Sequence, residues 1–315
     1  MEKLKIVFMG TPGFAVGILD TIYQNNYDIA AVITAPDKPA GRGQKVSISA
    51  VKEYALQKGL TIMQPTNLKD PVFLEELKQL GANLQVVVAF RMLPEAVWKM
   101  PKLGTFNLHA SLLPQYRGAA PINWAIINGE EQTGVTTFFI DEKIDTGAMI
   151  LREQIDIKPD ETAGELHDRL MDLGKDAVIK TLALIETDNV QTTIQPQSSD
   201  IKTAYKLNKE NCRINWQASG IEIYNLIRGL CPYPAAWTFI TDNETEWNVK
   251  IYESKFVPAD TSEPTGTLIS DKKSLKIAVS GGYLEILSLQ FPGKKRMFTR
   301  DLLNGIQFSE NAKAF

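Results

Sequence analysis

The sequence is poor in the residues that most often bind metals or form crosslinks, with two cysteines and two histidines among 315 residues. Cys212 and Cys231 lack the spacing of a metal site, which argues against a zinc site or a disulfide scaffold and indicates a reducing compartment. We therefore expect no bound metal. Long apolar runs are also absent, since the opening run at residues 4–9 is too short for a signal-peptide core or a membrane span. These absences predict a cytoplasmic protein.

Neither sign of charge dominates the chain, whose net charge is −3. A composition of 44% hydrophobic and 23% charged residues is typical of a globular protein, and the length fits one large or two modest domains. The total charge does not indicate a nucleic-acid partner. Residues 201–315, however, hold 15 Lys and Arg against 12 Asp and Glu, whereas the preceding residues are acidic overall. This modest asymmetry gives weak support for a polyanionic partner.

The glycine fingerprint of dinucleotide-binding enzymes is missing as well. Gly10-Thr11-Pro12-Gly13 lies in the first strand-to-helix turn, but it does not form the G-x-G-x-x-G pattern. No acidic residue ends the second strand, which runs into Thr34 and Pro36. A nicotinamide cofactor is therefore not expected.

Strand and helix patterns alternate through the first part of the chain. Strands separated by helices predict parallel βαβ units in an α/β, Rossmann-like open twisted sheet, which we assign to residues 1–189. The polar stretch 190–208 predicts a surface linker. In residues 209–315, one helix and five short strands predict a smaller, OB-like β-barrel domain. The expected strands are 5–9, 29–34, 85–90, 105–109, 136–140 and 150–157, then 236–240, 249–256, 266–269, 275–279 and 284–289; the expected helices are 14–23, 49–57, one opening at Asp70-Pro71, 121–127, 163–186 and 219–228.

One of the two histidines lies beside an asparagine in the segment Asn107-Leu108-His109. In an extended strand, residues i and i+2 point to the same face, so Asn107 and His109 are expected to project together at a strand's carboxyl end. An amide donor beside an imidazole can hold an oxyanion and move a proton. Taken alone, the segment is better explained as a partly buried strand end whose polar side chains satisfy backbone groups.

Asp145 follows the expected strand 136–140, so we expect it at the carboxyl edge of the sheet as well. A carboxylate there would orient the imidazole, but an acidic turn closed by Gly147 explains the same residues. The other histidine, His167, borders an apolar stripe on a helix and is predicted to be structural.

Two basic clusters flank these candidates in the sequence. Residues 37–46 form a basic, glycine-punctuated insertion that contains Arg42 and Lys45, and a second cluster is Lys294-Lys295-Arg296. Solvated surface is the ordinary explanation for each cluster. A mobile arm that meets phosphates, and a small barrel that binds nucleic acid along one face, are the sharper alternatives.

The order of the central motifs resembles the folate-dependent formyltransferase superfamily. Asn-x-His is followed by Ser-Leu-Leu-Pro at 111–114, Arg-Gly-Ala-Ala-Pro at 117–121 and Asp-Thr-Gly at 145–147. Gly10-Thr11-Pro12 with Phe14-Ala15, together with Pro-Ala-Gly-Arg-Gly at 39–43, looks like the methionyl-tRNA formyltransferases within that superfamily. The resemblance covers essentially the whole chain.

The resemblance implies transfer of a formyl group from 10-formyltetrahydrofolate to the α-amino group of methionyl initiator tRNA, for translation initiation, by a monomer. It implies a formyltransferase domain, a linker and a tRNA-binding barrel, in that order. One departure is that the chain runs directly from Phe90 to Arg91, where many relatives have a longer, glycine-containing segment. The residues implied are Asn107, His109 and Asp145 for catalysis; Phe90, Arg91, Met92, Ser111, Leu112, Leu113 and Pro114 for the folate co-substrate; and Arg42, Lys45, Lys294, Lys295 and Arg296 for tRNA.

Other activities remain open from the sequence. Formyltransferases that act on amino sugar nucleotides have the same kind of sheet as the one predicted here and a similar C-terminal part. A formyltetrahydrofolate hydrolase is a further alternative. A glycinamide ribonucleotide formyltransferase fits less well, because that family is shorter and lacks the second domain. A non-catalytic tRNA-binding module would keep the basic clusters, but it has no need for Asn107, His109 and Asp145 together.

Overall fold

The computed structural model describes residues 3–40 and 45–315. The chain divides into two compact units, and neither is continuous in sequence. The first comprises Met1–Gly118, Thr133–Ile155 and His167–Thr203; the second comprises Ala119–Gln132, Asp156–Leu166 and Ala204–Phe315. Three separate segments therefore build each unit, so composition along the chain is a limited guide to where one unit ends. The domain boundaries drawn from the sequence stay a prediction.

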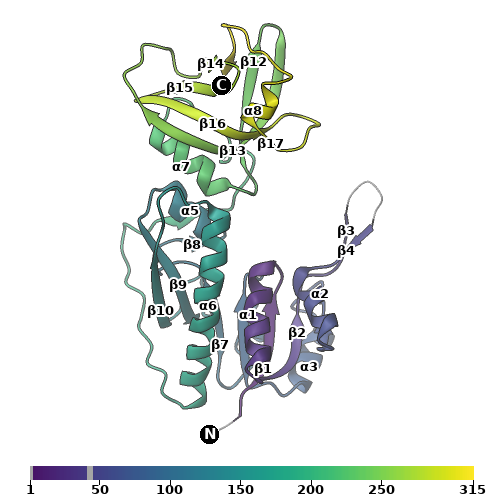
Figure 1. Ribbon diagram of the computed structural model, residues 1–315. Helices are drawn as coiled ribbons and strands as arrows, with labels where there is room; N and C mark the ends of the chain where they lie inside the picture. Colours follow the sequence, from purple (N-terminus) through teal and green to yellow (C-terminus); the bar gives the residue numbers. More distant parts are fainter. Residues whose placement is uncertain (1–2, 41–44) are drawn as a thin grey trace. The chain divides into compact units, whose positions relative to one another are not determined.

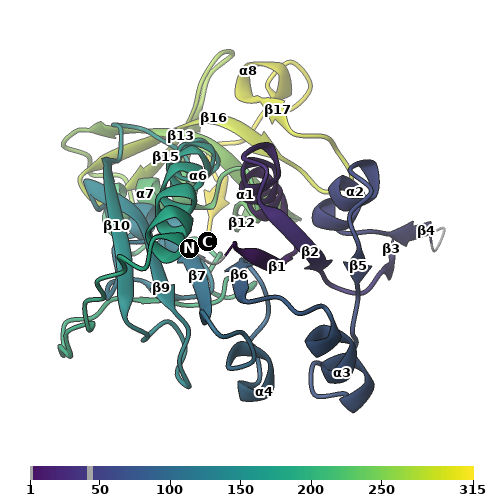
Figure 2. The ribbon, with the colours of Figure 1, turned by 90° about the horizontal axis from the view of Figure 1, so that it is seen from below.

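Seven strands of the first unit, among the described residues, form one sheet in the order β10-β9-β7-β6-β1-β2-β5. The pairs β1–β2, β1–β6, β2–β5 and β6–β7 are parallel, as expected for an open α/β sheet. Helices α1 and α6 lie on one side of this sheet and α3 and α4 on the other (Figures 1 and 2). The strands are β1 (Lys5–Gly10), β2 (Asp28–Ile33), β5 (Ile62–Met63), β6 (Leu84–Val88), β7 (Thr105–His109), β9 (Gln132–Phe139) and β10 (Met149–Asp156).

The expectation of parallel units throughout is wrong at β9, which pairs with β7 in the antiparallel direction. A parallel return requires a crossover that packs on the sheet. Here the residues between β7 and β9 include Ala119–Gln132, which belong to the second unit. Because His109, the last residue of β7, pairs with Thr136 and the earlier Phe106 pairs with Phe139, the chain re-enters the sheet at the same end from which it left β7.

Local signals account for most of the helices of the first unit. Asp70 caps α3, accepting a hydrogen bond from the backbone N–H of Val72 at 3.0 Å, and Pro71 occupies the first turn, as the sequence predicts. Gly174 lets α6 approach β7, because a Cβ there would lie 2.8 Å from Cδ2 of Leu108. None of the helices formed by the described residues is both long and apolar enough to cross a membrane. The helices are α1 (Gly13–Gln24), α2 (Ala50–Gln57), α3 (Pro71–Gln79), α4 (Glu95–Trp98) and α6 (Ala163–Glu186).

The second unit contains an antiparallel sheet in the order β14-β15-β16-β13-β12-β18, with β17 paired to β16. A bridge between Thr267 and Lys313 joins its two ends, so the sheet is a nearly closed barrel, as predicted. Helix α7 begins with a capping box of Ser219 and Glu222. The elements are α5 (Pro121–Ile127), α7 (Gly220–Leu230), β12 (Ala236–Asp242), β13 (Thr245–Pro258), β14 (Leu268–Ser270), β15 (Leu275–Val279), β16 (Gly282–Gln290), β17 (Met297–Phe298), α8 (Thr299–Leu302) and β18 (Lys313–Ala314).

Candidate active site

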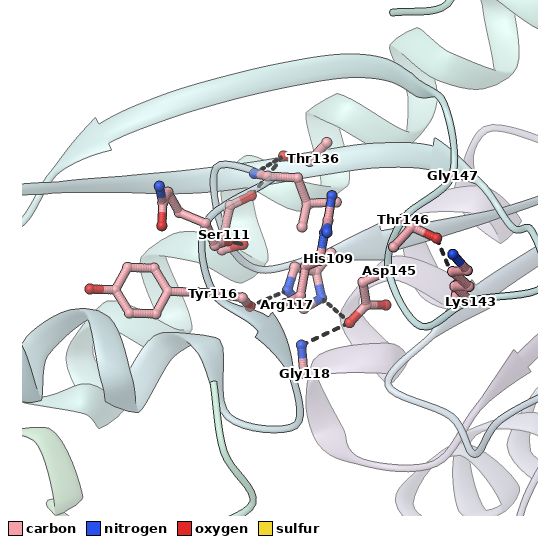
Figure 3. Close-up of polar contacts among 12 residues, drawn as sticks. His109, Ser111, Tyr116, Arg117, Gly118, Thr136, Lys143, Asp145, Thr146 and Gly147 are labelled. Atoms are coloured by element: carbon pink, nitrogen blue, oxygen red, sulfur yellow. Dashed lines mark hydrogen bonds and ion pairs between the residues drawn. The ribbon is translucent and has the colours of Figure 1, made fainter. Parts of the chain in front are cut away.

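His109 is the last residue of β7, at the carboxyl end of that strand, and it is only 6% exposed. Its Nε2 lies 2.8 Å from the backbone carbonyl oxygen of Tyr116 (Figure 3). A carbonyl oxygen only accepts hydrogen bonds, so Nε2 carries the proton in this arrangement. Nδ1 is therefore the ring nitrogen at which a proton is gained or lost.

Asp145 faces that second nitrogen, with its Oδ2 3.8 Å from Nδ1 of His109. The distance suits an ion pair with the protonated ring but exceeds that of a direct hydrogen bond. The same carboxylate oxygen accepts a hydrogen bond from the backbone N–H of Gly118 at 2.9 Å, which fixes its position (Figure 3). The structure thus brings together the imidazole and the carboxylate that the sequence singled out.

The route by which Asp145 reaches His109 differs from the one expected. Because β9 runs antiparallel, its last residue, Phe139, pairs with Phe106, near the start of β7, whereas His109 pairs with Thr136. Asp145 therefore does not lie at a shared carboxyl edge. The loop of residues 140–148 turns back from the end of β9 and carries Asp145, at a left-handed φ of 55°, to the imidazole.

The return of this loop depends on Gly147. A Cβ at this position would lie 1.6 Å from the backbone carbonyl oxygen of Phe139, a distance that no rotamer change relieves. We expect Gly147→Ala to destabilise the protein by about 1–3 kcal/mol or more, because the backbone must shift. Thermal and urea unfolding would measure the loss. Gly13→Ala is the control, since its Cβ would meet nothing within 4 Å, and equal stability of the two variants would contradict the prediction.

Asn107 lies two residues before His109 on β7 and is half-buried. Its backbone pairs with Val87 on one side and Phe138 on the other, so the strand is held in place from both edges. Among the described residues, its side-chain amide has no hydrogen-bond partner. A side-chain amide on a fixed strand that the protein leaves free is available to a bound substrate.

The segment predicted for the folate co-substrate is anchored by Thr136, which the sequence analysis did not identify. The Thr136 hydroxyl donates to the carbonyl oxygen of Ser111 at 2.7 Å and accepts from the N–H of Leu113 at 3.1 Å. Ser111 and Leu113 are fully buried, and the Ser111 hydroxyl donates to the carbonyl oxygen of Gln115 at 2.6 Å. Only Leu112 and Pro114 of the four predicted residues are partly exposed.

The predicted pterin segment follows β6. The guanidinium of Arg91 donates to the carbonyl oxygens of Pro65 and Thr66, and burial lowers the pKa of Arg91 below its ordinary value. The ring of Phe90 lies 5.6 Å from the Arg91 Cζ, whereas Met92 is 72% exposed. Arg91 thus braces the segment while staying exposed, and Met92 is an exposed apolar side chain beside it.

The predicted tRNA residues differ in how they are held. Arg42 lies outside the described residues, and Lys45 begins β4 (Lys45–Ser47), which pairs with β3 (Lys38–Ala40) in the antiparallel direction. In the second unit, Lys294 and Lys295 are exposed. Arg296 is engaged within the protein: it pairs with Glu253, donates to the Ser288 hydroxyl at 2.8 Å, and lies over the Tyr252 ring at 4.6 Å.

The other histidine plays no part in this arrangement. His167 lies on α6, its ring packs edge-on against Phe14 with 5.3 Å between centroids, and its Nδ1 contacts Asp168 at 2.9 Å. This placement agrees with a structural role. A buried polar residue that the sequence did not signal is Gln195, 5% exposed in a stretch predicted to be a surface linker. It contacts the Asp145 loop directly.

Comparison with known proteins identifies relatives for both parts of the chain. Residues 4–182 match the formyl transferase family model, and residues 206–307 match that of the formyl transferase C-terminal domain. Methionyl-tRNA formyltransferase of Flavobacterium johnsoniae is 68% identical over 315 residues, covering 100% of both chains. That of Bacteroides thetaiotaomicron is 49% identical, covering 99% of this chain and 98% of its own.

Solved structures share the fold at lower identity. A sugar 3N-formyl transferase, WlaRD, determined in the presence of dTDP and 5-N-formyl-THF, has a TM-score of 0.65 at 23% identity and covers 94% of this chain and 100% of its own. HypX from Aquifex aeolicus in complex with tetrahydrofolic acid has a TM-score of 0.65 at 15% identity, covering 98% of this chain and 49% of its own.

Proposed function

The chain belongs to the formyl transferase family, and from this premise we propose that it transfers the formyl group of 10-formyltetrahydrofolate to the α-amino group of methionyl initiator tRNA. The observation that carries the proposal is the full-length similarity, 68% over 315 residues, to a methionyl-tRNA formyltransferase. The pairing of His109 with Asp145 beside a free amide gives the chain the groups that this chemistry needs.

The proposed chemistry is attack of the free amine on the formyl carbon, which forms a tetrahedral intermediate with a negatively charged oxygen. Asn107 donates a hydrogen bond from its amide to that oxygen. The bond between the formyl carbon and N10 of the folate then breaks, so N10 must gain a proton and the amine must lose one. His109 carries this proton, accepting it at Nδ1 and returning it to the folate nitrogen.

Asp145 supports the proton transfer without touching the reacting atoms. Its carboxylate, 3.8 Å from Nδ1, stabilises the imidazolium that forms when His109 accepts the proton. The hydrogen bond between Nε2 and the Tyr116 carbonyl oxygen keeps the ring from turning Nδ1 away. The two contacts together orient the ring during the reaction.

The formyl donor, the folate co-substrate, and the formyl acceptor, the tRNA, are assigned to different residues. The folate co-substrate is proposed to lie along the segments 90–92 and 111–114, where Met92, Leu112 and Pro114 offer accessible surface. The tRNA is proposed to meet Arg42, Lys45 and the cluster of Lys294, Lys295 and Arg296. Of the latter cluster, the two exposed lysines are the side chains free to reach phosphates.

The decisive experiment is a formyl-transfer assay with 10-formyltetrahydrofolate and methionyl initiator tRNA, in which an aminoacylated elongator tRNA and an amino sugar nucleotide compete as acceptors. We expect the initiator tRNA to be the preferred acceptor. Preference for the amino sugar nucleotide, or release of formate without transfer, would overturn the proposal in favour of a sugar formyltransferase or a hydrolase.

The salt dependence of tRNA binding provides a separate prediction. Replacing Lys294 and Lys295 by glutamine is expected to reduce the slope of log K against log salt by about one for each lysine that contacts a phosphate. The matched control replaces Lys272 and Lys273, an exposed pair in the turn before β15, with the same change of charge. Equal slopes for the two double variants would remove Lys294 and Lys295 from the tRNA site.

A further inference from the structure

Gln195 lies at the centre of the hydrogen bonds that hold the candidate site together. Its side-chain Nε2 donates to the backbone carbonyl oxygens of Asp145 at 2.9 Å and Gly147 at 2.8 Å. Its Oε1 accepts from Nε of Arg117 at 3.1 Å and from Nη2 of the same guanidinium at 2.7 Å. All four hydrogen-bonding positions of the amide are therefore occupied.

The chemistry of these partners fixes how the amide is oriented. Arginine only donates hydrogen bonds and backbone carbonyl oxygens only accept them, so the oxygen of Gln195 must face Arg117 and its nitrogen must face the loop. The side chain is 5% exposed, so water does not readily replace these partners. A buried, fully satisfied amide of this kind holds its neighbours in one arrangement.

The contacts close a ring that contains Asp145. Gln195 holds the carbonyl oxygen of Asp145 on one side and the guanidinium of Arg117 on the other. Arg117 is joined by a peptide bond to Gly118, and the N–H of Gly118 holds the carboxylate of Asp145 at 2.9 Å. One side chain therefore fixes both the backbone and, through Arg117, the carboxylate of the residue that faces His109.

We propose that Gln195 is a positioning residue for the transfer reaction, which sets the carboxylate of Asp145 against Nδ1 of His109. The expected effect on kcat rests on the proposed function, whereas the effect on the position of Asp145 does not. Asp145 has a left-handed φ of 55°, a conformation that needs outside support for a residue other than glycine. Without the two hydrogen bonds from Nε2, the loop loses that support, and the separation of 3.8 Å between carboxylate and imidazole is no longer maintained.

The first test is kinetic. Gln195→Met keeps the length of the side chain and removes all four hydrogen bonds, and it is expected to lower kcat by about 10- to 100-fold. KM for both substrates should stay near the wild-type values, because the buried amide of Gln195 is fully engaged within the protein. Gln197→Met, at an exposed position two residues further along, is the matched control and should behave as wild type. A Gln195→Met variant that folds and keeps wild-type kcat would overturn the proposal.

Two further variants separate a positioning role from a general loss of stability. Gln195→Glu still accepts hydrogen bonds from Arg117 but cannot donate to the loop, so it should lower kcat as Gln195→Met does. In an Asp145→Asn background, Gln195→Met should lower kcat little further, because both changes remove the same interaction with His109. Activity restored by Gln195→Glu, or fully additive losses, would contradict action through Asp145.

A spectroscopic measurement tests the structural part without any substrate. With two histidines in the chain, the ring ¹⁵N signals of His109 are assigned by comparison with His167→Gln. Gln195→Met should shift the His109 signals and leave those of His167 unchanged. If the His109 signals do not move, Gln195 does not position Asp145; if they move but the protein formylates no tRNA, the proposed function fails and the positioning role stands.

Discussion

Replacing His109 by alanine is expected to lower kcat for formyl transfer by about 100- to 10,000-fold, the range usual for loss of a general acid–base group. The variant removes the imidazole and with it Nδ1, the nitrogen that faces Asp145 and is not bonded to Tyr116. Single-turnover formylation of methionyl initiator tRNA measures the effect directly, because it separates the chemical step from product release.

The chain supplies its own control for this prediction. His167→Ala removes the other histidine, whose ring packs against Phe14 and whose Nδ1 contacts Asp168 rather than Asp145, and should leave kcat unchanged. Because His109 is also hydrogen-bonded to Tyr116, unfolding curves must accompany the assay. A folded His109→Ala variant with a turnover comparable to that of His167→Ala would show that the imidazole does not carry the proton.

Replacing Asn107 by alanine is expected to lower kcat by about 100- to 1000-fold while binding of the folate co-substrate stays largely intact. The variant should lower kcat rather than folate affinity, because the hydrogen bond from the amide to the formyl oxygen is strongest once that oxygen carries negative charge. Folate binding by calorimetry and transfer by single-turnover assay measure the two quantities separately.

Asn107→Asp distinguishes the donor role from simple occupancy of the site. Aspartate has nearly the shape of asparagine, but when ionised it presents only acceptors to the developing negative charge. It should therefore not restore activity relative to alanine. Near-normal turnover by Asn107→Asp would contradict the assignment of Asn107 as the hydrogen-bond donor to the oxyanion.

Much of the secondary structure could be read locally. The spacing of apolar residues and the capping residues predict α5 and α6 with the bounds that the structure gives, and β7 and β15 likewise. The juxtaposition of Asn107 and His109 on one strand follows from the two-residue period alone. These features depend on residues close together in the chain, which is why the sequence carries them.

Other features depend on residues far apart and left no local signal. The antiparallel direction of β9 depends on the end of the sheet at which the chain returns after residues 119–132, and the spacing of apolar residues carries no information about that. The pairing of Arg296 with Glu253 joins positions 43 residues apart. All three residues of this basic cluster are exposed, but, among the residues that the structure describes, the arginine is paired within the protein and the two lysines are not.

The sequence by itself determined the chemical groups of the site, because the amide, the imidazole and the carboxylate are properties of residue type. Only the tertiary structure decided how they act. In the folded protein, Nε2 of His109 donates a hydrogen bond to the carbonyl oxygen of Tyr116, so Nδ1 faces Asp145. Asp145 reaches this position on the loop that turns back after β9. That loop is held by Gln195, whose partners lie 48 to 78 residues away. Contacts over such separations form only when the chain has folded, so no local pattern encodes them.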